Sequence, residues 1–206
     1  MHLHAQDLGR RFGRQWIFRR LSYDFQPGTA TAILGPNGAG KSTLLSILAG
    51  QLLPTEGQVA YTLGSQPLPP SAIPKYLAYC APYLELPEDF TLLELLTFHT
   101  KLKPLRPGVS VAGLVELMYL HKARHQAVRT FSSGMKQRLK LGLALYAAAP
   151  LLLLDEPTTN LDAQGAAWYQ EHLARVRDAD RLVIVSSNVP AEYAFCEAQV
   201  QITDFQ

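Results

Sequence analysis

The sequence predicts an α/β fold with a mostly parallel sheet, an N-terminal antiparallel β subdomain and an inserted α-helical subdomain. Two observations support this. Short apolar stretches alternate with helix-forming stretches toward both ends of the chain, as in parallel sheets. Between them, from Thr91 onward, leucines recur with helical spacing and form a separate block. With 206 residues, the chain can bury one substantial core and a smaller lobe, but not two full domains.

The N-terminal part is expected to hold several strands and one helix. In chain order these are strands Trp16–Phe25 and Thr29–Leu34, helix Leu44–Leu48, and strands Gln58–Leu63 and Tyr76–Cys80. The proline-rich stretch 67–74 is predicted to be a loop.

The remaining part is expected to be helical at first and then to return to α/β alternation. In chain order the elements are helices Leu92–Leu102, Val109–Leu120 and Gly134–Ala148, the buried strand Leu151–Leu154, helix Ala163–Arg177 and the last core strand Arg181–Ser186.

Charge gives a weak indication of partners. The net charge of +2 is too small to argue for nucleic acid by itself. Several arginines do gather near the N-terminus, namely Arg10, Arg11, Arg14, Arg19 and Arg20. They could contact lipid or nucleic acid, or form the solvated face of a β-hairpin. We favour the solvated face, because acidic residues elsewhere nearly balance the chain.

The cysteines and the apolar stretches predict a soluble chain in a reducing compartment. Cys80 and Cys196 lack metal-type or redox-type spacing, so reduced thiols are expected. No signal peptide is visible at the N-terminus. The longest apolar stretch, Leu139–Leu154, is too short to span a bilayer.

The segment Gly35–Thr43, here called the phosphate loop, matches G-x-x-x-x-G-K-[ST] between a predicted strand and a predicted helix. Its glycines let the backbone approach an anion, and the helix N-terminus directs N–H groups toward phosphates. Lys41 can reach the outer phosphates, and the Ser42 hydroxyl can bind Mg²⁺. The sequence therefore predicts nucleoside triphosphate binding by residues Gly35, Asn37, Gly38, Gly40, Lys41, Ser42 and Thr43.

Two adjacent carboxylates follow the buried strand Leu151–Leu154, at the edge where such sheets place ligands. Asp155 can hold Mg²⁺ through water, and Glu156 can orient and polarise an attacking water. An acidic pair that merely favours a helix N-terminus is the alternative.

The segment Phe131–Arg138 predicts a second anion site, because a Ser-Ser-Gly turn leads into a helix. One active site does not need two such sites, but two copies packed head-to-tail do. The phosphate loop of one copy would then face Ser132 and Gly134 of the other. A simple N-cap at Ser132 or Ser133 is compatible with this interpretation.

These motifs resemble those of ATP-binding cassette (ABC) ATPases, in the same order and over nearly the whole chain. Phe131–Met135 is similar to the family signature Leu-Ser-Gly-Gly-Gln, with Ser132 and Gly134 matching. Leu151–Glu156 matches the second nucleotide motif, and 160–162 matches the loop after it. The resemblance implies a P-loop NTPase core, in one domain over 1–206 with a helical lobe at about 83–134.

The resemblance also implies partners and further contacts. Phe12 is at the position of an aromatic ring under the adenine, with Trp16 as the second candidate, although either ring could be hairpin core. Asp162 would contact the opposing subunit. The family acts as head-to-tail dimers around ATP and Mg²⁺ with a separate transmembrane permease, which implies a cytoplasmic location at the inner face of the membrane.

Two positions depart from the family. Pro82 stands where a glutamine usually reaches Mg²⁺, and proline offers no side-chain ligand. Asn188 stands where a catalytic histidine contacts the γ-phosphate; its amide can donate a hydrogen bond but carries no charge. We expect nucleotide binding to survive both changes, and hydrolysis to be more sensitive.

Two groups of residues are weaker candidates. His121 and His125 have i, i+4 spacing suited to a metal, but a solvated or locally hydrogen-bonded pair is favoured. Tyr83, Leu84 and Leu86 could form an apolar groove for a helix of a membrane partner, or pack against the helical lobe itself.

The sequence thus favours the ATPase subunit of a transporter. The short length resembles exporter ATPases, including the haem-exporter type used in cytochrome c maturation. A nucleotide-dependent binding module with little hydrolysis is the alternative, because of Pro82 and Asn188. ABC ATPases that act on nucleic acid carry a long coiled coil or two cassettes, and neither fits in 206 residues.

Overall fold

The computed structural model describes all residues from Met1 to Gln206, and the chain divides into two compact units. The sheet unit comprises Met1–Tyr79, Ala149–Glu156 and Arg177–Gln206. The helical unit comprises Cys80–Ala148 and Pro157–Val176. The helical unit contains all of α5 (Ser133–Leu145) and α6 (Ala163–Val176), which pack together. It therefore extends beyond the lobe of about 83–134 that the sequence suggested.

The sheet unit contains a five-stranded sheet with the order β6-β7-β8-β3-β9. Its strands are β3 (Ala30–Leu34), β6 (Leu77–Cys80), β7 (Leu151–Asp155), β8 (Leu182–Ser186) and β9 (Ala198–Gln201). β3 runs parallel to β8 and β9, and β7 runs parallel to β8. Every residue of β3, β7 and β8 is buried, which explains their nearly continuous apolar sequences. The predicted mostly parallel sheet is confirmed.

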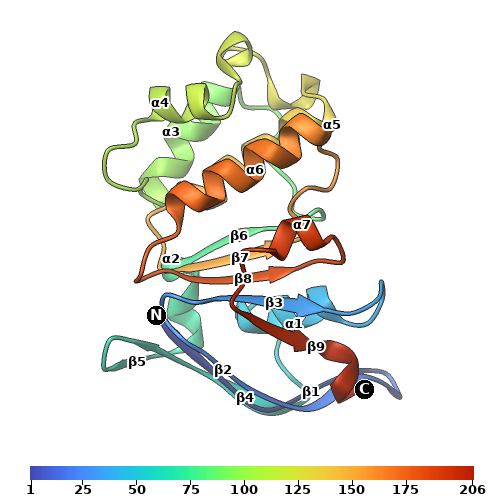
Figure 1. Cartoon of the computed structure of the whole chain (residues 1–206). Helices are drawn as coiled ribbons and strands as arrows, with labels where there is room; N and C mark the ends of the chain where they lie inside the picture. The colour runs from blue at the N-terminus through green and yellow to red at the C-terminus, as the bar shows by residue number, and fades with distance from the viewer. The chain divides into compact units, whose positions relative to one another are not determined.

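The helix α1 (Lys41–Leu48) follows β3 through the phosphate loop and packs against the same sheet (Figure 1). Leu44, Leu45 and Leu48 are fully buried, and they belong to one core cluster with Ile33 of β3. This packing fixes the start of α1 relative to the strand that precedes it. The loop between them is thereby held at both ends.

The sheet unit also contains an antiparallel sheet, with the order β2-β1-β4-β5. Its strands are β1 (His2–Phe12), β2 (Gln15–Phe25), β4 (Glu56–Leu63) and β5 (Gln66–Leu68). Leu3, Leu8 and Phe25 are fully buried in the core cluster that also contains the residues of α1. The predicted antiparallel β subdomain is confirmed.

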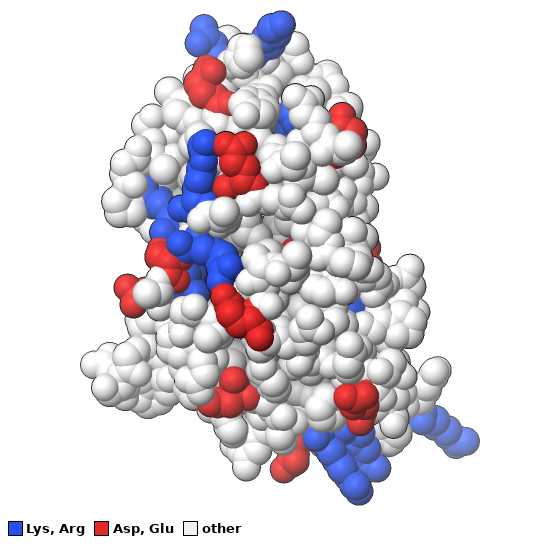
Figure 2. All heavy atoms as spheres, viewed as in Figure 1, with Lys and Arg blue, Asp and Glu red and all other residues white.

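The N-terminal arginines lie on β1, β2 and the turn between them. Arg19 donates hydrogen bonds of 2.9 and 3.0 Å to the Glu56 carboxylate, and the Arg10 guanidinium lies 4.5 Å from the Phe12 ring centre. Figure 2 shows basic side chains gathered at the lower edge, with acidic ones beside them. These contacts support the solvated-face interpretation.

The helical unit is built from α3 (Leu92–Leu102), α4 (Val111–Leu117), α5 and α6. A capping box starts α3: the Glu94 N–H donates to Thr91 Oγ1, and the Thr91 N–H donates to the Glu94 carboxylate. The Trp168 indole N–H donates to the Leu117 carbonyl at 2.7 Å and joins α6 to α4. Tyr146, just after α5, shares a 2.5 Å hydrogen bond with the buried His172 of α6.

Two expectations about the chain's organisation were wrong. The stretch 67–74 is not only a loop, since it holds most of β5, the 3-10 turn Pro70–Ala72 and the start of α2 (Ile73–Tyr76). β8 is not the last core strand, because α7 (Pro190–Tyr193) and β9 follow it. β9 escapes sequence reasoning because it is a short edge strand with one buried residue, Val200.

The observed ends of two helices differ from the predicted ends by only a few residues. α5 ends at Leu145, before the predicted Ala148, and α4 is shorter than predicted at both ends. Further 3-10 turns lie at His121–Ala123, Val128–Thr130 and Ile202–Phe205. None of the helices combines the length and apolarity that a membrane crossing requires.

Candidate functional site

The phosphate loop joins the buried strand β3 to α1, as predicted. Gly35, Gly38 and Gly40 all have positive φ, of 149°, 81° and 102°. A Cβ atom at Gly40 would lie 2.3 Å from the Ile17 side chain, and one at Gly35 would lie 2.7 Å from the Ile202 side chain. Glycine is therefore required at these two positions both by conformation and by space.

A small hollow of about 200 Å³, here called the phosphate hollow, opens at this loop. It is lined by Ile17, Asn37, Gly38, Gly40, Lys41, Ser42, Thr43 and Glu156. The structure thus brings six predicted residues of the loop together with the predicted catalytic carboxylate. Sequence reasoning missed Ile17, because an apolar side chain on a strand carries no chemical signal.

Lys41 is 4% exposed, and its ammonium group donates hydrogen bonds to the Gly35 and Pro36 carbonyls at 2.7 and 3.2 Å. Burial lowers the pKa of Lys41, while the nearby carboxylates of Glu156 and Asp155 act in the opposite direction. The cation is thus held inside its own loop, close to the hollow where an anion would lie.

Asp155 ends β7 and is 1% exposed. Its Oδ1 accepts a 2.5 Å hydrogen bond from the buried Ser186 hydroxyl, whereas its Oδ2 is buried without a partner. An unsatisfied buried carboxylate oxygen is costly unless a cation or water completes it. Together with the Ser42 side chain in the hollow, this donor set fits a hard divalent cation such as Mg²⁺.

Glu156 lines the phosphate hollow from the turn after β7. Its N–H donates to the Ser186 carbonyl at 2.9 Å, and its φ is +44°, an unfavourable value for a residue with a Cβ atom. Such strain persists where surrounding structure enforces it and is common at functional sites. The strained turn directs this carboxylate to the same hollow as Lys41.

Asn188 reaches the tip of the phosphate loop. Its side-chain N–H donates a 2.6 Å hydrogen bond to Asn37 Oδ1. The segment is held by the buried Ser187, whose hydroxyl donates to the Glu192 carboxylate and accepts from the Val189 N–H. Asn188 therefore lies beside the loop, as predicted, and Ser187 is a supporting residue that sequence reasoning missed.

The two aromatic candidates for adenine stacking do not line the phosphate hollow. Phe12 is 51% exposed with the Arg10 guanidinium over its ring, and Trp16 is half-buried with Arg19 over its ring. An exposed ring is free to stack on a base, so the assignment to Phe12 stays a prediction.

The predicted second anion site lies at the start of α5. Ser132 is the N-cap, and its hydroxyl accepts a 3.2 Å hydrogen bond from the Met135 N–H. A Cβ atom at Gly134 would lie 3.3 Å from the Asn160 carbonyl oxygen. Asp162 accepts a 2.7 Å hydrogen bond from the Gly165 N–H at the start of α6. The N-cap interpretation is thus confirmed, and it is compatible with an anion site.

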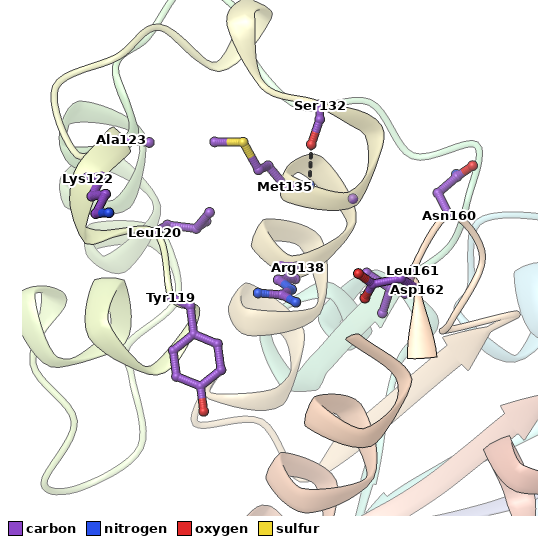
Figure 3. A pocket seen from close by; sticks show the side chains of 11 residues that line it. Tyr119, Leu120, Lys122, Ala123, Ser132, Met135, Arg138, Asn160, Leu161 and Asp162 are labelled. Atoms are coloured by element: carbon purple, nitrogen blue, oxygen red, sulfur yellow. Dashed lines mark hydrogen bonds between the residues drawn. The ribbon is translucent and has the colours of Figure 1, made fainter. Parts of the chain in front are cut away.

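These residues surround a second hollow of about 440 Å³, the signature hollow (Figure 3). It is lined by Tyr119, Leu120, Lys122, Ala123, Ser132, Gly134, Met135, Arg138, Asn160, Leu161 and Asp162. The structure therefore brings three predicted residues, Ser132, Gly134 and Asp162, into one site. All of its lining residues belong to the helical unit.

Pro82 lies in a turn after β6, and its carbonyl accepts a 2.9 Å hydrogen bond from the Lys140 ammonium group. Nearby, Tyr83 is 52% exposed, while Leu84 and Leu86 are half-buried. These exposures are compatible both with a groove for a partner helix and with packing against the helical unit. The groove therefore stays a prediction.

The two histidines each have a local partner. His121 lies 3.8 Å from the Glu116 carboxylate, and His125 accepts a 3.1 Å hydrogen bond from Arg124. No group of three potential metal ligands of the His, Cys, Asp and Glu types occurs in the chain. The local pairing favoured from the sequence accounts for both residues.

The fold and the phosphate hollow together define a nucleotide-binding protein with a P-loop NTPase fold. Comparison with known proteins specifies the family, because residues 18–159 match the ABC transporter family model. The chain therefore belongs to the ABC transporter family, as one of its ATP-binding, ATP-hydrolysing subunits.

Individual relatives agree with this assignment. The chain is 32% identical to the cytochrome c biogenesis ATP-binding export protein CcmA of Rhizobium meliloti, covering 100% of this chain and 99% of the relative. It is also 32% identical to CcmA of Brucella abortus, covering 92% and 86%. An ABC transporter ATP-binding protein from Pyrococcus furiosus has the same fold, with a TM-score of 0.81, 19% identity and full coverage of both chains.

Proposed function

We propose that this chain hydrolyses MgATP in a head-to-tail pair of ATPase subunits and thereby drives a separate transmembrane permease. One observation carries the proposal: each of the two units has its own hollow at the N-terminus of a helix, α1 in one unit and α5 in the other. The phosphate hollow provides Lys41 and the loop N–H groups, and the signature hollow provides the start of α5. A triphosphate bound by one copy would be completed by the signature hollow of the other.

At the phosphate hollow the residues would divide the work. Lys41 would leave its own loop carbonyls and donate to the outer phosphate oxygens. Ser42 and Asp155 would hold Mg²⁺, which screens the negative charge of the phosphates. Glu156 would accept a hydrogen bond from the attacking water and orient it toward the terminal phosphate. Asn188, beside Asn37, would donate a hydrogen bond to that phosphate.

Family membership supports the proposed partners. Relatives named as export proteins for cytochrome c biogenesis favour an exporter, with the chain held peripherally at the inner face of the cell membrane through its permease. The exposed Tyr83 and the half-buried Leu84 and Leu86 are our candidates for part of the permease contact.

The direct test is Glu156→Gln, which keeps the shape of the side chain and removes its basicity. We expect turnover to fall at least about 100-fold, and ATP-dependent dimers to persist because bound nucleotide is no longer consumed. Phosphate release and sedimentation velocity measure the two effects. If the variant does not pair with another ATPase subunit in saturating MgATP, even when its permease and any second ATPase subunit are supplied, then ATP does not close a dimer.

A nucleotide-dependent binding module with little hydrolysis is the second candidate. It is favoured by Asn188, which cannot carry charge and already donates to Asn37. Glu156 in the phosphate hollow argues against it, since a pure binding module has little need of a base. Phosphate release by the purified chain, with and without its permease, separates the two candidates.

A further inference from the structure

The signature hollow has an aromatic and cationic end that no motif assigns. Figure 3 shows Ser132 at one end of the hollow and the Tyr119 ring at the other, with Arg138 of α5 between them. The first end is a helix N-terminus with a serine hydroxyl. The two ends therefore differ in chemistry, and the far end needs an explanation of its own.

Tyr119 occupies a backbone position that usually holds glycine. The Tyr119 N–H donates to the Glu116 carbonyl at 2.9 Å, and the Leu120 N–H donates to the Val115 carbonyl at 3.1 Å. These are the two hydrogen bonds of a Schellman motif at the end of α4. The left-handed residue of this motif is Tyr119, with φ of +58°. A side chain with a Cβ atom is strained in this conformation, so glycine would suit the fold better.

Burial does not compensate for the strain at Tyr119, because the residue is 53% exposed. The Tyr119 ring lies under Arg138, whose guanidinium carbon is 5.7 Å from the ring centre. A cation over an exposed ring adds little stability. The fold alone therefore gives little reason for an aromatic residue at this position.

The cations of the signature hollow are not neutralised by the protein. Neither Lys122 nor Arg138 forms an ion pair or a side-chain hydrogen bond. The acidic residue of the lining, Asp162, already accepts a hydrogen bond from the Gly165 N–H. The hollow therefore offers positive charge and an exposed ring to a ligand that is anionic and contains an aromatic group.

We propose that Tyr119 and Arg138 are positioning residues for the nucleotide that the opposing copy presents. Tyr119 stacks on the base, and Arg138 donates to oxygens between the base and the terminal phosphate. A nucleotide matches the polarity of the hollow, because its phosphates suit the start of α5 and its base suits the aromatic end. This inference rests on the proposed function, since only a paired copy brings nucleotide to this hollow.

The test measures the ATP concentration that gives half-maximal dimer by sedimentation velocity, in the Glu156→Gln background. Adding Tyr119→Gly is expected to raise this concentration about tenfold, which corresponds to one stacking contact. Its melting temperature, Tm, is expected to stay the same or rise by about 2–4 °C, because the strain is relieved. Tyr119→Phe is the matched control and should keep the original ATP dependence.

A second variant tests the cation. Arg138→Gln in the same background should also need several-fold more ATP, roughly 3–10-fold, with a smaller effect at high salt. Binding of a fluorescent ATP analogue to the monomer should not change for either variant, because the phosphate hollow is in the other unit.

The following outcomes would contradict the inference. An unchanged ATP dependence in Tyr119→Gly, or a loss of dimer accompanied by a fall in Tm, would show that the ring is structural only. If Glu156→Gln itself does not pair in ATP, the proposed function and this inference fail together. If it pairs and only the Tyr119 and Arg138 effects are missing, the proposed function stands without the inference.

Discussion

The two hollows differ in how far the protein itself satisfies their polar groups. In the phosphate hollow, Lys41 donates to its own loop carbonyls and Asn37 accepts from Asn188. In the larger signature hollow, Lys122 and Arg138 have no ion-pair partner. The first site is thus internally organised, whereas the second keeps charge available for something brought to it. The difference suggests that one site captures nucleotide and the other recognises nucleotide already captured.

The largest effect is expected at the phosphate hollow. Lys41→Ala removes the one buried ammonium group beside the loop, and the lost charge-assisted hydrogen bonds should weaken ATP binding by roughly 10–100-fold. ATP turnover should fall further, at least about 1,000-fold, because the same charge stabilises the transition state. Fluorescent-nucleotide titration and phosphate release measure these losses. Lys75→Ala, at an exposed position, is the control, and retained turnover in Lys41→Ala would contradict the assignment of this site.

Gly134→Val tests the other side of the comparison. The added side chain would crowd the Asn160 carbonyl and the start of α5. We expect a single copy to bind ATP with its original affinity. In contrast, the dimer should no longer form in ATP, and turnover should fall at least about 100-fold. Ser133→Val introduces the same side chain at an exposed neighbouring position of α5 and should have a much smaller effect. If Gly134→Val weakens binding by the monomer, the two hollows do not have the separate roles proposed here.

Asn188→His is expected to have a moderate effect in the opposite direction. A histidine can supply the charged donor that asparagine cannot, so turnover should rise, by roughly tenfold at most, with similar ATP affinity. Asn188→Gln keeps the amide and serves as control. An unchanged or slower rate in Asn188→His would mean that the position does not contact the terminal phosphate, or that the site has adapted to asparagine.

The smallest expected effect concerns stability rather than either hollow. Burial lowers the pKa of His172 from its usual 6.5, and Arg175 lowers it further. The folded state therefore disfavours protonation of His172. The stability that neutral His172 contributes is fully present above about pH 6.5, and it is lost as the pH falls toward the lower pKa of the folded state. Half-buried His99 also has its pKa lowered, by desolvation and then by the nearby Lys103.

His172→Gln should therefore show a smaller fall in Tm between pH 7 and pH 5.5 than the wild type, by about 2–4 °C. Thermal unfolding at the two pH values measures it. His121→Gln, at an exposed position, should behave like the wild type. Equal pH dependence in His172→Gln and the wild type would show that His172 is not responsible.

The sequence predicted the parallel sheet and the glycine-rich loop between β3 and α1 well, because both depend on local patterns. The buried strands β3 and β7 are continuous apolar runs, and the glycines of the loop have a fixed spacing. Asp155 and Glu156 could be placed because they lie at the end of a buried strand and directly after it.

The features that were missed depend on tertiary contacts. Ile17 reaches the phosphate hollow only because the antiparallel sheet packs near the loop, and β9 pairs with β3 through a register that its sequence does not reveal. The strain at Glu156 and Tyr119 could not be predicted, since neither residue type favours positive φ.

The residues after β8 have a consequence for the making of the protein. β9 pairs with β3, the Ile202 side chain fills the space behind Gly35, and the Gln206 amide donates to the Ala39 carbonyl at 3.2 Å, 167 residues away in the chain. A nascent polypeptide that has emerged only as far as β8 lacks all three supports. Its glycine-rich loop remains without them until the segment 198–206 leaves the ribosome. We therefore expect the loop to become able to bind ATP late in translation, after Ser132 and Gly134 have emerged.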